Sequence, residues 1–303
     1  MFGGAITALV TPMRDGAIDF DALRDFVEWQ VAEGIDGVVP CGTTGEAATL
    51  SDDEMAKVIK TVVDQVNKRV PVIAGAGANN TARAIKYGRL AFEAGADALL
   101  HVTPYYNKPP QSGLIAHFTQ IADASKLPIV LYNVPGRTAC DMLPATVAEL
   151  AKHPRIVGIK EATASIERAQ AIIAAIDGVA AIHGTAGGDG DFAVMSGDDF
   201  TCLALTLVGG SGVISVVSNV APKLTQQMIA AARAADLVTA RKINYQLLPL
   251  IGALFTEANP IPVKAAVAHL GFGANSVRAP LLPHGGEHLE RLIALINKIG
   301  IKR

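Results

Sequence analysis

A single lysine closes a short aliphatic segment near the middle of this chain. Lys160 follows the residues IVGI at 156–159 and precedes Glu161. An amine surrounded by aliphatic side chains is partly removed from water, which disfavours its charged form and lowers its pKa. The neutral amine can attack a carbonyl carbon and form a Schiff base. A charged residue at the end of a strand is more often a solvated structural residue, so the fold around Lys160 decides between the two interpretations.

Hydroxyl side chains follow other segments of the same aliphatic kind. Thr43 and Thr44 belong to GTTGE at 42–46, where glycines let backbone amides approach an anion and hydroxyls can relay protons. Tyr132 stands near the end of Ile129–Val134 and can act as a general acid or base beside an amine nucleophile. The alternatives are an ordinary turn for the threonines and a structural hydrogen bond for the tyrosine.

Two loops carry further candidates. Arg137 lies in PGRT at 135–138, and its guanidinium can hold a carboxylate in a bidentate pair. A solvated loop arginine is an equally good interpretation of the residue alone. Tyr105 and Tyr106 lie among prolines in TPYYNKPP at 103–110, which predicts a stiff loop that packs on a ligand, a neighbouring subunit or the protein's own rim.

Short apolar segments that alternate with helical stretches must position these groups. Continuous apolar strands are typical of parallel sheets covered on both faces, and eight such units favour a closed (β/α)8 barrel over an open doubly wound sheet. Barrel active sites lie at the carboxyl ends of the strands, which is where these candidates stand. The expected strands are Ala5–Val10, Gly37–Cys41, Val72–Ala76, Ala98–Val102, Ile129–Val134, Ile156–Lys160, Phe192–Ser196 and Val213–Val217.

Helix boundaries are also visible in the sequence. Ser51 and Glu54 have the spacing of a capping box, and an earlier helix is expected from about Asp19 to Gly34. Residues 1–234 are predicted to form the barrel and residues 235–303 a C-terminal helical extension packed on it. The later helices are expected near Pro222–Ala234, Thr239–Phe255, Pro260–Leu270 and Gly286–Ile299.

Composition narrows the class of protein. The 303 residues carry a formal net charge of -2 without a basic stripe, which argues against nucleic-acid binding. Three widely spaced cysteines fit a reducing compartment, and we expect a cytoplasmic protein. The charge-free stretch Phe200–Pro222 is interrupted by GGSG at 209–212, so no membrane span is expected. The histidines lack metal-ligand spacing and 75–80 lacks a full GxGxxG, so we predict no metal and no dinucleotide cofactor.

Four motifs in order carry a family resemblance: GTTGE at 42–46, PYYNKP at 104–109, YNVPGR at 132–137 and GIKEA at 158–162. Together they closely resemble the dihydrodipicolinate synthase family of pyruvate-dependent class I aldolases. NPIPVK at 259–264 and SGDD at 196–199 are similar to further family segments. The likeness extends from about Phe2 to Pro283.

The resemblance implies a set of roles. Lys160 matches the Schiff-base lysine that captures pyruvate, and Arg137 matches the arginine that binds the carboxylate of aspartate semialdehyde. Such enzymes act in diaminopimelate and lysine biosynthesis, need no cofactor, and are usually homotetramers built as dimers of dimers. The implied proton relay is Thr43, Tyr132 and Tyr106, with Tyr106 reaching an adjoining subunit, and the implied pyruvate pocket is Thr44, Gly197 and Ile214.

Two departures from the family pattern are apparent. Residues 183–190, HGTAGGDG, resemble an insertion before the seventh strand, and their glycine content predicts a flexible or surface loop. Lysine-inhibited relatives line an allosteric pocket with histidines and a glutamate, whereas the matching residues here are Asp52, Met55 and Arg83. Asn79 and Tyr105 of that pocket are retained. Because Arg83 would repel an ammonium group, weak or absent feedback by lysine is expected.

Other functions remain open at this point. The nearest is another pyruvate aldolase, such as N-acetylneuraminate lyase or a keto-deoxy sugar acid aldolase. Arg137 argues against the sialic acid lyases, which usually carry a non-basic residue there because their partner is a sugar. A ligand-sensing barrel without catalysis is disfavoured by the joint presence of Lys160, Tyr132 and Thr43.

Overall fold

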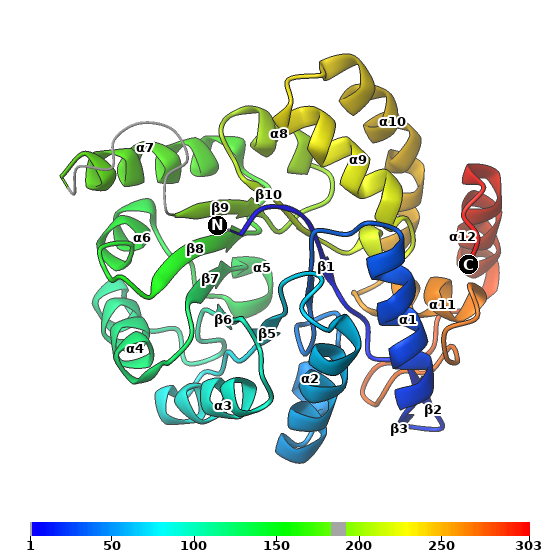
Figure 1. Cartoon of the computed structure of the whole chain (residues 1–303), viewed down its shortest axis with the longest axis horizontal. Helices are drawn as coiled ribbons and strands as arrows, with labels where there is room; N and C mark the ends of the chain where they lie inside the picture. The colour runs from blue at the N-terminus through cyan, green and yellow to red at the C-terminus, as the bar shows by residue number, and fades with distance from the viewer. Residues whose placement is uncertain (1, 183–191) are drawn as a thin grey trace.

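The computed structural model describes residues 2–182 and 192–303, and of residues 177–182 the backbone alone. Eight parallel strands in this part of the chain form a TIM barrel, as the alternating segments predicted (Figure 1). Around the barrel the order is β4, β1, β10, β9, β8, β7, β6 and β5. The bridge between Val38 and Val72 joins the two ends of that order. The strands are β1 (Gly4–Ala8), β4 (Gly37–Val39), β5 (Ile73–Gly75), β6 (Ala98–Val102), β7 (Ile129–Asn133), β8 (Ile156–Glu161), β9 (Ala193–Ser196) and β10 (Gly212–Ser215).

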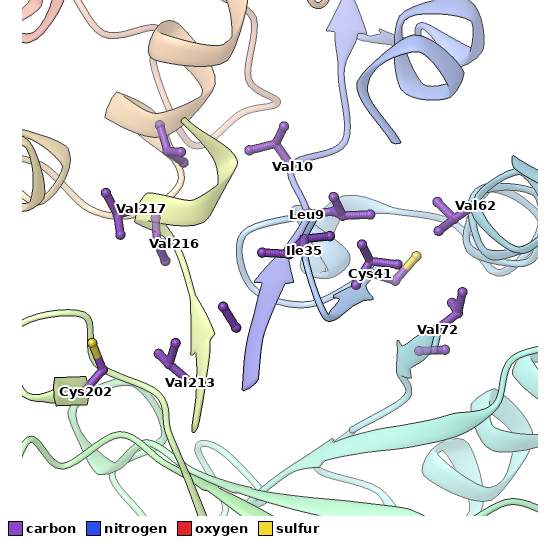
Figure 2. Packing of buried hydrophobic residues seen from close by; sticks show 14 of the residues in the cluster. Leu9, Val10, Ile35, Cys41, Val62, Val72, Cys202, Val213, Val216 and Val217 are labelled. Atoms are coloured by element: carbon purple, nitrogen blue, oxygen red, sulfur yellow. The ribbon is translucent and has the colours of Figure 1, made fainter. Parts of the chain in front are cut away.

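Side chains of the strands alternate between two apolar clusters. One cluster fills the barrel interior and includes Ile6, Ile73, Val130 and Ile214. The larger cluster lies between the barrel and its helices. Figure 2 shows part of it, where Val213 of β10 lies on one side of β1 and Val62 of helix α2 on the other. Burial on both faces explains why the strands read as continuous apolar segments.

Helices surround the barrel on its outer face (Figure 1). Ser51 and Glu54 form the predicted capping box, with the Ser51 amide donating to Glu54 Oε2 at 2.9 Å and the Glu54 amide to Ser51 Oγ at 3.2 Å. Gly34 has a φ of +86°, the left-handed geometry expected after the first helix. The helices are α1 (Phe20–Ala32), α2 (Asp52–Val66), α3 (Thr81–Glu93), α4 (Gln111–Ala124), α6 (Pro144–Leu150), α7 (Ile166–Ile182), α8 (Cys202–Leu207) and α9 (Pro222–Arg233).

Short elements and some boundaries differ from expectation. The strand expected over Val213–Val217 ends at Ser215, because the amides of Val216 and Val217 donate to Asp199 Oδ2 at 3.0 and 2.8 Å instead of to a neighbouring strand. The first strand likewise ends at Ala8 rather than Val10. The sequence analysis did not find β2 (Met13–Arg14), β3 (Ala17–Ile18), η1 (Ala47–Thr49), α5 (Pro135–Thr138) or η2 (Val217–Asn219).

The C-terminal segment is helical, as expected. It forms α10 (Leu237–Leu254), α11 (Ile261–His269) and α12 (Gly286–Ile299). Helix α10 packs along α9, and α12 packs on α10 and α11. Helix α10 contacts α8, α9 and η2 of the first segment. The division between residues 1–234 and 235–303 stays a prediction.

The charge-free stretch and the three cysteines both lie within the fold. The stretch Phe200–Pro222 forms α8, β10 and η2, and no helix within the described ranges is both long and apolar enough to cross a bilayer. Cys41, Cys140 and Cys202 are buried and free. The segment interpreted as an insertion, residues 183–190, lies outside the described residues.

Candidate active site

The candidate residues lie together at the carboxyl ends of the barrel strands. Tyr132 of β7 is paired in register with Lys160 of β8, and Gly197 follows β9 directly. Thr43 and Thr44 lie in the loop after β4. The strand continues one residue beyond Lys160, since Glu161 pairs with Ser196. The remaining candidates lie on α5 (Arg137), on β10 (Ile214) and in the loop after β6 (Tyr106).

Lys160 points into the barrel rather than into solvent. The residue is 6% exposed, and its Nζ lies 4.5 Å from the centroid of the Tyr132 ring. A Cβ on Gly197 would stand 2.9 Å from Lys160 Cε, too close for ordinary packing. A glycine at position 197 therefore leaves the space that the lysine side chain fills, which is a physical reason for its place in the pocket.

Burial lowers the pKa of Lys160 from its ordinary 10.5 to about 8. Loss of solvation is the largest cause; the charge of Asp199 acts against it and that of Arg137 with it. With a pKa of about 8, about a tenth of the amine is neutral at pH 7, against roughly 0.03% for an ordinary lysine. The site therefore holds a usable nucleophile at neutral pH.

This shift predicts the pH dependence of the amine. The rate of imine formation between Lys160 and a small keto acid should rise about tenfold per pH unit up to about pH 8 and level off above it. Because Arg137 lowers the pKa of Lys160, Arg137→Met should move the inflection to higher pH. Rapid-quench trapping with borohydride and mass spectrometry measures both profiles. An inflection near pH 10 in the unmodified protein contradicts the prediction.

Tyr132 is a buried phenol beside this amine. Desolvation raises its pKa, while Arg137 and a hydrogen bond with the Thr43 side chain act in the opposite direction. The phenol therefore keeps its proton at neutral pH, and the Thr43 hydroxyl is the group next along a path for that proton. The amine, the phenol and the hydroxyl thus lie in one place, and their catalytic roles stay predictions.

Asp199 is a site residue to which the sequence analysis gave no role. Its Oδ2 accepts the amides of Val216 and Val217, and Oδ1 is buried without a partner in the described part of the chain. Burial raises the pKa of this carboxyl. The available signal was a pair of aspartates immediately after an apolar strand, at the end of the barrel where chemistry is expected.

A residue of the C-terminal segment joins two candidate anion-binding groups. Asn259 lies between α10 and α11, and its Nδ2 donates to Thr44 Oγ1 at 3.0 Å. Its backbone carbonyl accepts a hydrogen bond from Arg137 Nη2 at 3.1 Å. In the sequence, Asn259 stands out only as part of NPIPVK at 259–264, a segment similar to the family. Nothing local in the sequence shows that it contacts the loop after β4.

The same segment holds the loop after β4 through a buried ion pair. Lys264 of α11 donates to Glu46, the last residue of GTTGE, and both side chains are 1% exposed. The backbone amide of Arg278 donates to the other carboxylate oxygen of Glu46 at 2.9 Å. Glu46 has a φ of +55°, an uncommon left-handed geometry for a side-chain-bearing residue. The pair therefore anchors a strained loop that carries Thr43 and Thr44.

Removal of one partner should destabilise the protein. Lys264→Met leaves the Glu46 carboxylate buried and uncompensated, so the free energy of unfolding should fall by about 3–5 kcal/mol. Glu46→Gln combined with Lys264→Met should recover most of that loss. Lys60→Met is the control, because the Lys60–Asp64 pair is exposed and should contribute under about 1 kcal/mol. Chemical denaturation measures all three variants, and equal losses for Lys264→Met and Lys60→Met contradict this role.

Tyr106 lies in the loop after β6, and its backbone amide donates to the carbonyl of Thr138, the neighbour of Arg137, at 3.4 Å. The residue is 90% exposed and its φ is +75°. The loop is held by Asn107 Nδ2, which donates to the Asn79 carbonyl at 2.8 Å, and by Asn79 Nδ2, which donates to the Tyr105 carbonyl at 3.2 Å. Both tyrosines are exposed in one chain, while contact of Tyr106 with an adjoining subunit stays a prediction.

A cavity of about 440 Å³ is lined by residues from the start of α2 and from α3. Its lining includes Asp52 and Arg83, two of the residues that depart from the family pattern, and also Lys86. Lys86 Nζ donates to Asp52 Oδ2 at 2.5 Å. The carboxylate in this cavity is therefore already paired with a cation.

Comparison with known proteins gives consistent matches over nearly the whole chain. The model of the Dihydrodipicolinate synthetase family matches residues 1–299. A 4-hydroxy-tetrahydrodipicolinate synthase from Geobacter metallireducens is 49% identical, over 98% of this chain and 99% of the relative. Another from Maridesulfovibrio salexigens is 50% identical over 93% of each chain. The crystal structure of the chloride-inhibited dihydrodipicolinate synthase from Acinetobacter baumannii, complexed with pyruvate, is 44% identical with a TM-score of 0.93, covering 99% of this chain and 100% of that one.

Proposed function

We propose, from the premise that this chain belongs to the dihydrodipicolinate synthetase family, that it condenses pyruvate with L-aspartate 4-semialdehyde to 4-hydroxy-tetrahydrodipicolinate. The reaction runs through a Schiff base on Lys160. The observation that carries the proposal is the buried Lys160 amine, with a pKa of about 8, in register with Tyr132. The enzyme is a lyase of the class I aldolase type that acts in diaminopimelate and lysine biosynthesis.

Lys160 performs the covalent steps. Its neutral amine adds to the keto carbon of pyruvate, and loss of water gives the imine. Loss of a methyl proton converts the imine to an enamine, whose carbon attacks the aldehyde carbon of the second substrate. The amino group of that substrate then attacks the imine carbon, closes the ring and releases the Lys160 amine.

Tyr132 and Thr43 move the protons of these steps. The phenol gives a proton to the departing hydroxyl during imine formation and to the oxygen of the attacked aldehyde, and the Thr43 hydroxyl passes protons to and from it. Tyr106 of an adjoining subunit completes the relay in this proposal. Tyr106 is exposed in one chain, so in this proposal it completes the relay only when a second subunit packs against it. We therefore propose a homotetramer built as a dimer of dimers. We also propose that the protein acts in the cytoplasm.

Thr44 and Arg137 bind the two substrate carboxylates. The Thr44 hydroxyl oxygen already accepts from Asn259, which leaves its own proton free to donate to the pyruvate carboxylate. Arg137 is exposed at the mouth and presents a guanidinium to the carboxylate of the aldehyde. Gly197 and Ile214 shape the pyruvate pocket, the first by leaving room and the second as an apolar wall inside the barrel.

A substrate assay tests the proposal. The purified protein with pyruvate and aspartate semialdehyde should form product in an assay coupled to the reductase that consumes it. Cleavage of sialic acid under the same conditions is the comparison for the other aldolases of this barrel. Turnover of sialic acid without turnover of aspartate semialdehyde would reject the proposed substrate.

Feedback by lysine is expected to be weak or absent. The cavity beside α2 and α3 presents Arg83 and Lys86 to a ligand. The Asp52 carboxylate in that cavity is already paired with Lys86. An ammonium group therefore meets cations where it needs an acceptor. Initial rates with L-lysine up to about 1 mM should stay unchanged, and half-inhibition below that concentration contradicts the expectation. Arg83→Glu is the test variant, because it reverses the charge and should create sensitivity to lysine.

A further inference from the structure

Asn259 presents a buried acceptor atom that the roles described so far do not use. The residue is 7% exposed. Its Nδ2 and its backbone carbonyl are engaged with Thr44 and Arg137. Its Oδ1 is buried and has no hydrogen-bond partner among residues 2–182 and 192–303. A buried amide oxygen without a partner is costly, so in a functional site such an atom indicates a bound group that donates to it.

The bond to Thr44 fixes the orientation of this amide. Nδ2 and Oδ1 leave the same carbon in different directions, so Oδ1 faces away from the Thr44 hydroxyl when Nδ2 donates to it. The carbonyl of the same residue contacts the Arg137 guanidinium. Oδ1 is thus carried by the residue that lies between the two proposed carboxylate-binding groups.

The second substrate of the proposed reaction brings a donor to this place. On the carbon beside the carboxylate that Arg137 binds, aspartate semialdehyde carries an ammonium group, which needs an acceptor once it leaves water. Two nearby carboxylates are engaged elsewhere. Glu46 is paired with Lys264, and Glu161 accepts hydrogen bonds from Asn133 Nδ2 and from the Thr163 amide.

Asp199 also has an oxygen without a partner, but it belongs to a different part of the site. It follows β9, whereas Arg137 follows β7, and β8 lies between them. Its charge acts on Lys160. Asn259, in contrast, contacts Arg137 directly. Its neutral oxygen can bind an ammonium group and still allow it to lose a proton, which the ring-closing attack requires.

We propose that Asn259 determines specificity for the second substrate by accepting a hydrogen bond at Oδ1 from the α-ammonium group, while Nδ2 holds Thr44 in place. This inference rests on the proposed function and adds the group that recognises the amino end of the aldehyde. It predicts that the enzyme distinguishes aspartate semialdehyde from succinate semialdehyde, which has the same carboxylate and aldehyde but no amino group.

Asn259→Ala and Asn259→Asp separate the two contacts. In Asn259→Ala the kcat/KM for aspartate semialdehyde should fall about 10- to 100-fold, the effect of losing one hydrogen bond to a charged group. The inhibition constant of succinate semialdehyde, corrected for any change in the KM of pyruvate, should change less than about threefold. Asn259→Asp keeps an acceptor and loses the donor to Thr44, so the KM of pyruvate should rise while the preference for the aminated aldehyde is kept.

Asn275→Ala is the matched control. Asn275 lies in the same C-terminal segment, donates from Nδ2 to the His284 carbonyl at 2.8 Å, and also has a buried Oδ1 without a partner in the described chain. Its replacement should leave the ratio between the two aldehydes unchanged. Borohydride trapping of pyruvate on each variant confirms that the Lys160 pocket is intact.

The outcomes are distinct. The inference is overturned if Asn259→Ala weakens the binding of both aldehydes equally, or of neither. A residue that only supports Thr44 and Arg137 would affect both aldehydes alike, because it makes no contact with the amino group. If Asn259→Ala does not fold, loss of the preference in Asn259→Asp overturns the inference and its retention supports it. Failure of the proposed function appears differently, since the unsubstituted enzyme would then not turn over aspartate semialdehyde.

Discussion

Replacement of Lys160 by methionine is expected to abolish imine formation and to lower kcat/KM for the condensation by roughly 10³-fold or more. The reason is that the imine is the electron sink for the carbon–carbon bond, and among residues 2–182 and 192–303 no other amine lies in register with Tyr132. Incubation with pyruvate and borohydride, followed by mass spectrometry, measures the loss directly. Lys242→Met on the exposed face of α10 is the control and should keep full trapping.

The same variant should be more stable than the unsubstituted protein. A pKa lowered from 10.5 to about 8 means that holding this group in the folded state costs about 3 kcal/mol at pH 7. The unfolded chain binds more protons between pH 8 and pH 10.5, so the stability of the unsubstituted protein should rise with pH in that window, and it carries the full penalty below pH 8. Lys160→Met should not show this rise. A methionine variant that still traps pyruvate at its usual rate would place the nucleophile elsewhere.

Tyr132→Phe is expected to lower kcat about 10²- to 10⁴-fold, the usual effect of removing a positioned acid–base group. The change removes the phenol proton and leaves the ring beside Lys160, so the packing of the pocket is kept. The KM of pyruvate should change little, because its carboxylate is assigned to Thr44. Steady-state kinetics with both substrates measures the change in kcat separately from the change in KM.

Two controls support the interpretation of this variant. Tyr245→Phe, on the exposed side of α10, should have the activity of the unsubstituted enzyme. Thr43→Val should reproduce part of the Tyr132→Phe defect, since Thr43 is the hydroxyl beside the phenol. If Tyr132→Phe raised KM and left kcat unchanged, the phenol would serve substrate binding and not proton transfer.

The sequence by itself determined the architecture and the end of the barrel at which the candidate residues lie. Aliphatic segments of strand length, separated by amphipathic helices with caps such as Ser51 and Glu54, specify a βα repeat because periodicity and capping are local properties. Parallel strands of a barrel share one carboxyl end, so residues that follow different strands converge there. That rule predicts Lys160, Tyr132 and Thr43 at the same end of the barrel.

The environment of each group was decided only by the tertiary structure. Sequence could not establish that Lys160 turns inward, because solvation depends on what surrounds a side chain in space. It gave no role to Asp199, and it missed α5 and the hairpin of β2 and β3, which are too short for a periodic pattern. The end of β10 was wrong by two residues because a side chain, Asp199, took the amides of the next turn.

The contacts of the C-terminal segment show the limit most clearly. Asn259 meets Thr44 across 215 positions of the chain, and Lys264 meets Glu46 across 218. No helical or strand period extends over such separations, so nothing in the local pattern relates these residues to the loop after β4. Local sequence sets where elements begin and end, whereas the closure of the barrel and the packing of the extension bring these side chains together.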